Sequence, residues 1–223
     1  MWKIFQKTDS FYFILIIFSV FFSFIIFLSI PAVFDYKKMS ANINNQIESD
    51  YSLNLKNSSK FEYRFFPSPH LYVKKTDLSI DNKSNLISEE IKDLKIFVSI
   101  LKLYNFKQIK IKKIFIKNAN FKFSEDNFKL FLNNLNTNKT KPLVIKNSKF
   151  FYIDKNEEVL IISPIKKINY LFNDKTNQSK LKIDGNLFDT DFDFTWSKDF
   201  TKIDESEFKL KFSNPNIILE NFI

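Results

Sequence analysis

The sequence predicts a mainly β protein with one N-terminal transmembrane helix and a few short helices, an α+β fold. Three observations predict it: Phe11–Ile30 is apolar and uncharged, apolar and polar side chains alternate from Tyr51 onward, and a phrase built on Ile-Lys-Asn recurs. A chain of 223 residues with one span leaves room for one globular domain or an elongated single-layer structure. We therefore expect a tail at 1–10, a transmembrane helix at 11–30, an amphipathic linker helix at 31–50 and a β domain at 51–223.

Phe11–Ile30 has the length of a membrane span. Twenty helical residues, at about 1.5 Å each, cover the roughly 30 Å of a bilayer's hydrocarbon core. A cleaved signal peptide is the alternative, but its apolar core is typically about 7–15 residues long and ends in a small-x-small site. Ser29-Ile30-Pro31-Ala32 is a poor site of that kind, so the sequence favours an uncleaved anchor.

The charges flanking the span are nearly balanced. Lys3 and Lys7 precede it, and Lys37 and Lys38 follow it, so the excess of positive charge that marks a cytoplasmic flank does not decide the orientation. The free amino terminus adds to the first flank and Asp35 offsets the second. Together they favour a short cytoplasmic tail and an exported domain.

The net charge of +9 raises the question of a nucleic-acid or anionic-lipid partner. The basic residues are nearly all Lys and are spread along a chain crowded with Asn, Ile and Phe. That pattern is typical of nucleotide-composition bias, so we expect no nucleic-acid partner and only a general attraction to lipid headgroups.

An amphipathic helix is expected directly after the span. Tyr36, Met39, Ile43 and Ile47 recur at three- and four-residue spacing and share one helical face. Such a helix either caps the end of a sheet or rests on the membrane surface. The apolar face is narrow, which favours the cap.

Strands follow, because the period changes from helical to two. A short turn of helix is expected after Ile100 and another helix at Phe128–Leu135, with a polar loop at Asn136–Lys141 and a hairpin turn at Asp184-Gly185. The expected strands contain Tyr51–Leu55, Phe61–Phe65, Leu71–Val73, Leu78–Ile80, Leu94–Ile100, Ile109–Ile111, Val159–Ile162, Ile168–Phe172, Leu181–Ile183, Phe192–Trp196 and Phe208–Phe212.

A recurring phrase is the most informative feature of the β domain. Ile116–Phe123 returns as Ile145–Tyr152, and Leu55-Lys56-Asn57 begins a relative that is one residue longer. Each copy has an apolar residue, a short polar turn and two apolar residues two apart. We interpret it as a strand end, a tight corner and the next strand, in which Asn supplies the backbone conformation of the corner.

The layout resembles the amino-terminal region of the AsmA family of bacterial envelope proteins. The span ends just before Phe34-Asp35-Tyr36, and after the helix Phe65–Leu71 (FFPSPHL) leads to Leu78-Ser79-Ile80. The resemblance covers about residues 1–155, and its remaining features are Ile100-Leu101-Lys102-Leu103-Tyr104, Ile109–Ile114 and the Asn118–Phe121 phrase.

The resemblance implies a protein anchored in the bacterial inner membrane by a single pass, with its domain in the periplasm. It also implies an elongated, curled antiparallel-type sheet that forms an open groove and carries phospholipid toward the outer membrane or aids outer-membrane assembly. Curling would hide the apolar face of strands that little helix covers. Many members of the family are several times longer, so a complete bridge across the envelope would need a partner or self-association.

Acyl chains of membrane lipids are the partner expected in such a groove. The residues expected to line it are the alternating apolar ones: Leu53, Leu55, Tyr63, Leu71, Val73, Leu78, Ile80, Leu94, Ile96, Ile109, Ile111, Ile116, Phe121, Phe123, Phe150 and Tyr152.

Groups suited to catalysis are scarce. The single histidine, His70, lies in a turn with no carboxylate at a metal-ligand spacing, and the Ser99–Lys102 spacing lacks the companion motifs of acyl-transferring enzymes. Asp189, Asp191 and Asp193 alternate and are better explained as a solvated face than as a cation site. One glycine cannot form a phosphate loop, and without cysteine there is no thiolate or disulfide. We expect no enzyme, cofactor or metal.

Two functions therefore remain. The first is lipid binding or transfer of the AsmA type. The second is a structural or assembly scaffold that docks by edge-strand pairing, resembling the small tethered component of lipopolysaccharide export. A membrane-tethered hydrolase is disfavoured, and would require an essential His70 or Ser99.

Overall fold

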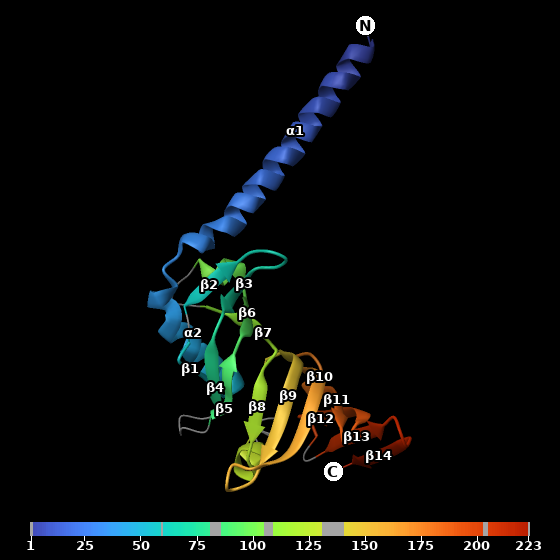
Figure 1. Cartoon of the computed structure of the whole chain (residues 1–223). Coiled ribbons are helices and arrows are strands. Elements are labelled where there is room, and N and C mark those ends of the chain that lie inside the picture. Colours follow the sequence, from blue (N-terminus) through green and yellow to red (C-terminus); the bar gives the residue numbers. More distant parts are fainter. Residues whose placement is uncertain are drawn as a thin grey trace.

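The protein is mainly β, with a long N-terminal helix that extends away from one end of an open sheet (Figure 1). This computed structural model describes residues 2–58, 60–80, 86–104, 109–130, 141–202 and 205–222. All the described strands belong to one 14-stranded sheet, and within these residues its terminal strand β14 does not pair back onto the first strands. The direction of the strands changes between β8 and β14, so the sheet is twisted and curved (Figure 1).

The N-terminal helix α1 spans Trp2–Ser29 and is followed by the 3₁₀ helix η1 at Ile30–Val33. The apolar stretch Phe11–Val33 is long enough to cross a membrane, and none of its hydrophobic window is buried in the protein. Pro31 lies in the first turn of η1, where a backbone N–H would have no hydrogen-bond acceptor within the helix, so a proline is tolerated.

Helix α2, Tyr36–Tyr51, is the expected amphipathic helix, and it covers the sheet. It begins at Asp35, whose carboxylate accepts a hydrogen bond from the Lys37 backbone N–H at 3.1 Å. It ends at Ser52, which has a left-handed backbone. The side chains expected on its apolar face are buried, and Tyr51 joins them. The interpretation as a cap is therefore confirmed.

The C-terminal end of α2 contacts the residues that directly precede β9. The Lys141 ammonium lies 2.6 Å from the Asp50 carboxylate, and both side chains are largely shielded from solvent. The Tyr51 hydroxyl donates to the Pro142 carbonyl at 3.4 Å, and burial raises the pKa of this phenol. These contacts join residues separated by 91 positions.

The strands of the first half form two branches. The bounds are β1 Leu53–Lys56, β2 Phe61–Arg64, β3 His70–Val73, β4 Thr76–Ile80, β5 Leu86–Ile91, β6 Asp93–Val98, β7 Ile111–Lys117 and β8 Asn120–Phe123, and the short helix α3 spans Ile100–Leu103. One branch runs β1-β4-β5-β8 and the other β2-β3-β6-β7. Both end on β9, Leu143–Ile153. Strand β5 was not predicted, because apolar and polar residues do not alternate along LISEEI.

The two copies of the recurring phrase pair with each other in the sheet. β7 and β8 both lie parallel to β9, with Ile116 opposite Ile145 and Phe121 opposite Phe150. Asn118 and Asn147 have matching left-handed φ values of 56° and 48°. In the first copy this produces the expected corner, whereas in the second it bends a continuous strand. The expectation of a strand break at the second copy was therefore wrong.

Hydrogen bonds between the copies hold the two bends together. The Asn118 N–H donates to the Lys146 carbonyl at 3.1 Å, and the Lys149 N–H donates to the Ala119 carbonyl at 2.9 Å. The buried Ser148 hydroxyl accepts from the Ala119 N–H at 3.2 Å. Asn tolerates positive φ better than other non-glycine residues, which explains its recurrence at these positions.

From β9 onward the sheet is an antiparallel meander. Its strands are β10 Val159–Asn173, β11 Gln178–Leu187, β12 Thr190–Asp199, β13 Ser206–Phe212 and β14 Ile217–Phe222. The two strands expected at 159–162 and 168–172 are a single strand, β10. Pro164 is compatible with it because pairing with β11 starts only at Ile165. Beside it the Ser163 hydroxyl donates to the Asn186 carbonyl at 2.8 Å.

The hairpin turn expected at Asp184-Gly185 was misplaced. Gly185 is in the middle of β11, opposite Ile165 and Phe192, and the turn is formed by Phe188 and Asp189 with φ values of 50° and 60°. Positive φ at both central residues matches the twist of the flanking strands. Gly185 relieves crowding, because a Cβ there would lie 3.0 Å from the Ile165 side chain and from the Phe192 ring, closer than most Cβ contacts.

Replacing Gly185 by Val is expected to lower the free energy of unfolding by about 1–3 kcal/mol, because the added methyl groups overpack this contact. Urea unfolding of the full chain in detergent micelles measures the change. The double variant Gly185→Val/Phe192→Ala should recover much of the loss, since it removes the ring that the new side chain meets. Additive effects of the two substitutions would contradict this explanation.

Two expectations lie partly outside the described residues. Residues 125–130 are helical, which agrees with the beginning of the helix expected at Phe128–Leu135, but 131–140 are not described. The loop expected at Asn136–Lys141 therefore remains a prediction. The helical turn expected near Ile100 is α3, which begins at Ile100 itself.

Candidate apolar binding face

Most residues expected to line a groove belong to the core of the N-terminal half. They pack beneath α2 and between the two branches of the sheet, and each is at most 9% exposed. An acyl chain could reach them only if this core opened. These buried residues are Leu53, Leu55, Leu71, Val73, Leu78, Leu94, Ile96, Ile109, Ile111, Ile116, Phe121 and Phe123.

The remaining expected lining residues are at the margins of this core. Tyr63, Phe150 and Tyr152 are half-buried, and the side chain of Ile80 lies outside the described residues. Phe150 packs edge-on against Phe121, with ring centroids 5.1 Å apart. Their role in lipid binding stays a prediction.

A continuous apolar surface lies instead across the C-terminal strands. Cross-strand pairs align the apolar side chains into three rows, of which the first runs from β9 to β14, the second from β9 to β13 and the third from β10 to β14. One row is Ile145, Ile168, Ile183, Phe194, Leu210 and Leu219; a second is Leu143, Tyr170, Leu181, Trp196 and Phe208; a third is Ile165, Gly185, Phe192, Phe212 and Ile217.

These rows become progressively more exposed toward the free edge of the sheet. Leu181 on β11 is 3% exposed, the side chains on β12 and β13 are half-buried, and Leu219 on β14 is 51% exposed. We call the accessible part the open apolar face. It consists of Ile183, Phe192, Phe194, Trp196, Phe208, Leu210, Phe212, Ile217 and Leu219.

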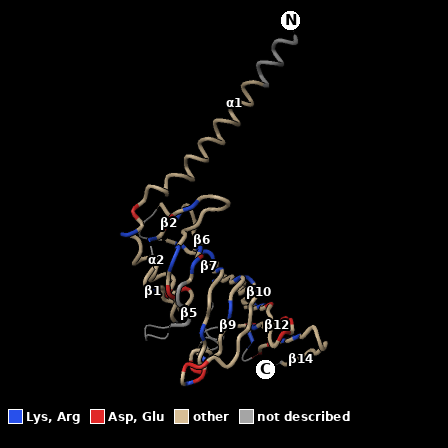
Figure 2. The backbone as a smooth tube through the Cα atoms, viewed as in Figure 1, with Lys and Arg blue, Asp and Glu red and all other residues tan. Residues whose placement is uncertain are grey.

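The opposite face of the same strands is polar. Asp184 is opposite Asp193, and Lys209 forms an ion pair with Glu220 across β13 and β14. Lys166 reaches Asp191 at 2.7 Å, and this contact, with a hydrogen bond from Asn186, lowers the pKa of the Asp191 carboxyl. Figure 2 shows positive charges at several separate places along the chain. Strands β11 to β13 thus have one polar face and one apolar face, whereas β14 also carries the apolar Ile218 on the polar side.

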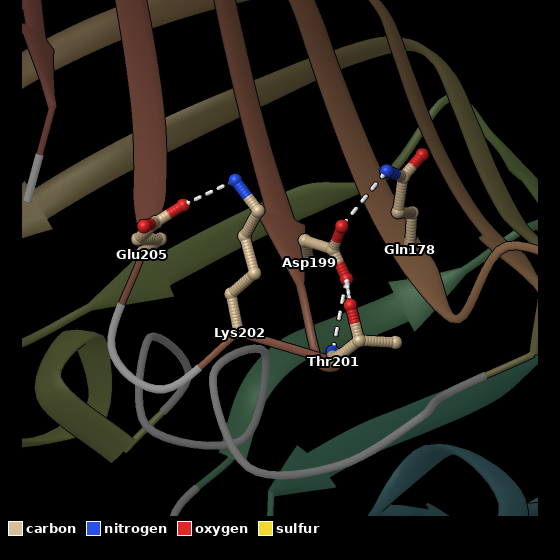
Figure 3. A network of polar contacts seen from close by, with 5 residues as sticks. All are labelled: Gln178, Asp199, Thr201, Lys202 and Glu205. Atoms are coloured by element: carbon tan, nitrogen blue, oxygen red, sulfur yellow. Dashed lines mark hydrogen bonds and ion pairs between the residues drawn. The ribbon is translucent and has the colours of Figure 1, made fainter.

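A hollow of about 960 Å³, lined mostly by polar and charged residues, lies where β10 to β13 meet their connecting turns. Asp199 is at its centre: its carboxylate accepts from the Thr201 hydroxyl at 2.6 Å, the Thr201 N–H at 2.9 Å and the Gln178 amide at 3.2 Å (Figure 3). These bonds lower the pKa of Asp199. Lys202 pairs with Glu205 at 2.7 Å (Figure 3). The network satisfies the backbone of a turn, and each of its groups already has a partner.

The groups considered for catalysis are not assembled into a site. His70 is buried at the start of β3, outside the turn expected for it; its Nδ1 atom lies 2.7 Å from the Ser68 carbonyl, and its ring is tilted against Phe97 with centroids 5.4 Å apart. Ser99 begins α3. Asp189, Asp191 and Asp193 are exposed, as expected of a solvated face. Across the described ranges, no cluster of three or more His, Asp or Glu side chains could hold a metal ion.

The sequence contained part of the signal for the open apolar face. Phe192, Phe194 and Trp196 alternate with polar residues, as do Phe208–Phe212, but we expected only strands there and placed the groove earlier in the chain. Ile217, Ile218 and Leu219 are consecutive and show no alternation, so β14 was missed.

The most distinctive surface for binding is therefore the open apolar face, a strip of aliphatic and aromatic side chains continuous with the core. Its chemistry suits an apolar partner that can lie along a sheet, such as an acyl chain or another protein surface. The sequence matches no protein-family model, and no curated protein sequence is significantly similar to it.

Proposed function

We propose that this protein is a membrane-anchored, non-enzymatic lipid-binding protein whose open apolar face holds acyl chains of phospholipid. In this proposal it is an AsmA-like protein of a bacterial inner membrane, with a cytoplasmic amino terminus and a periplasmic β domain. It would pass phospholipid toward the outer membrane or aid outer-membrane assembly.

The observation that carries the proposal is the continuity of the apolar rows from the buried core to the exposed edge. Each methylene group removed from water contributes about 0.8 kcal/mol, so a chain lying along several half-exposed aromatic and aliphatic side chains would be held without a specific polar contact. Leu210 and Leu219 pair directly on this face. On the other neighbouring strand, β12, Phe194 pairs with the same Leu210 and lies on the same face.

The long apolar helix supports the same proposal. α1 has the length and composition of a membrane span and leads directly into the β domain. An anchor would hold the β domain at a bilayer, which is a source of acyl chains, with β12 to β14 at the end of the domain away from α1 (Figure 1).

The decisive experiment is photocrosslinking of the full chain in phospholipid vesicles, with a benzophenone amino acid placed at single positions. Labels at Phe194 and Leu210 should form lipid adducts. A label at Lys209 is the matched control, because it neighbours Leu210 on β13 but lies on the polar face. Absence of lipid adducts at 194 and 210, or equal adducts at 209, would overturn the proposal.

A scaffold that binds another protein is the second candidate, and the free edge of β14 favours it. Within the described part of the chain β14 pairs with β13 alone, and Ile217, Ile218 and Leu219 are each about half exposed on its two faces. Exposed apolar edge strands are prone to pair with other strands. When the labelled chains are crosslinked in cells, where partner proteins are present, a scaffold would give one dominant protein adduct at Ile218 and no lipid adduct at Phe194.

A further inference from the structure

The lower end of α1 is fixed to the β domain by three tyrosines from separate elements. The Tyr36 hydroxyl, from α2, donates to the Pro31 carbonyl at 2.7 Å, and the Tyr63 hydroxyl, from β2, donates to the Leu28 carbonyl at 2.8 Å. Tyr104, which follows α3, donates to the Phe27 carbonyl. These carbonyls belong to the last turn of α1 and to η1, where a helix leaves its acceptors unpaired.

Aromatic contacts reinforce this junction. The Tyr104 ring stacks on Phe27 with centroids 5.0 Å apart and meets Phe34 edge-on at 5.8 Å. Desolvation raises the pKa of the Tyr36, Tyr63 and Tyr104 phenols, which are protonated donors at neutral pH in any case. The junction therefore holds α1 in a defined direction relative to the sheet, in contrast to a flexible tether.

Exposed apolar side chains surround the junction. Outside α1, the most exposed large hydrophobic side chains of the described residues are Val33 at 84%, Phe66 at 78%, Leu101 at 77% and Phe188 at 74%. Val33 is on η1, Phe66 is on the loop after β2, and Leu101 is on α3. Each is three residues from a tyrosine of the junction in the sequence. We call these three the basal patch. Figure 1 shows the loop between β2 and β3 projecting beside the lower end of α1.

We propose that the basal patch inserts into the interface of the same bilayer that α1 spans. Its occupant is set by continuity: the patch borders the point where the apolar surface of the spanning helix meets the β domain. Exposed Lys37, Lys38 and Lys102 flank it in the sequence and suit the phosphates of anionic headgroups. The span and the patch together would dock the β domain on the membrane with one face toward the lipid.

This inference rests on the span that the proposed function assumes, but it does not depend on lipid transfer. The chain contains no cysteine, so a single introduced cysteine can carry a unique environment-sensitive fluorophore. The variants Phe66→Cys and Leu101→Cys place it in the basal patch, and Ile17→Cys places it in the span. Phe188→Cys is the control, since it is equally exposed and apolar but sits at the β11–β12 turn, in the part of the sheet distant from α1.

The labelled full chains are reconstituted into vesicles of zwitterionic and anionic phospholipid that carry spin-labelled acyl chains. We expect labels at 66 and 101 to lose most of their fluorescence to shallow spin labels, the label at 17 to deep spin labels, and the label at 188 to keep its fluorescence. Quenching at 17 with none at 66 or 101 overturns the basal patch and leaves the span intact. No quenching at 17 removes the span, and the proposal falls with it.

Discussion

Replacing Phe194 by Asp is expected to reduce lipid crosslinking from a benzophenone at Leu210 by about a hundredfold. The two side chains are direct cross-strand partners at the centre of the open apolar face. A carboxylate in contact with hydrocarbon costs about 2.5–3.5 kcal/mol, and each 1.4 kcal/mol is a factor of ten in affinity. Adduct yield measured against lipid concentration in vesicles gives the change.

The matched control for this variant is Thr195→Asp. Thr195 is the next residue on β12 but belongs to the opposite face, where it pairs with Lys182 and Lys209. A carboxylate there meets two positive charges and water, so lipid adducts at 210 should be unchanged. If Thr195→Asp were as damaging as Phe194→Asp, the loss would reflect a disturbed strand, and the assignment of the acyl chain to the open apolar face would fail.

Replacing Ile43 by Ala is expected to lower the free energy of unfolding by about 2–5 kcal/mol, because the side chain is fully buried at the centre of α2's apolar face. The loss combines the removed apolar contacts with the cavity left beneath a helix that two strands and the junction hold in place. Urea unfolding in micelles, followed by far-UV circular dichroism, measures it.

Asn45→Ala is the control for Ile43→Ala, since Asn45 is two residues away and exposed. Its effect should be within about 0.5 kcal/mol of zero, as for most surface substitutions. The comparison also bears on where lipid binds. If α2 were a mobile lid over a groove in the N-terminal half, Ile43 would not be packed permanently and its truncation would cost little.

The location of the accessible apolar surface shows what the alternation of side chains can and cannot predict. Leu71 and Phe194 both alternate with polar neighbours, and both face the inside of the sheet. Leu71 is fully buried because it lies inside the core that α2 and the strands of both branches share, whereas Phe194 is half-buried at the margin of that core. The alternation of apolar and polar residues identifies the face of the sheet on which a side chain lies. It does not identify which element packs on that face.

The recurring phrase and Gly185 show that residue types predict local backbone conformation only in part. The Asn residues indicated left-handed corners, and Asn57, Asn118 and Asn147 have positive φ. The parallel pairing of the copies was not predictable, since it depends on how the two branches meet on β9. Because glycine is common in turns, Gly185 suggested a turn at this position. It lies instead within β11, where the Phe192 and Ile165 side chains leave little room for a Cβ atom.

By itself the sequence determined the N-terminal apolar helix, the amphipathic α2 that follows it and most of the period-two strands, because each depends on residues close together in the chain. The tertiary structure alone decided that the phrase repeats lie side by side, that three distant tyrosines fix the end of α1, and that the apolar rows emerge from the core at β12 to β14. These features join segments separated by tens of residues, and local patterns carry no information about which distant segments will meet.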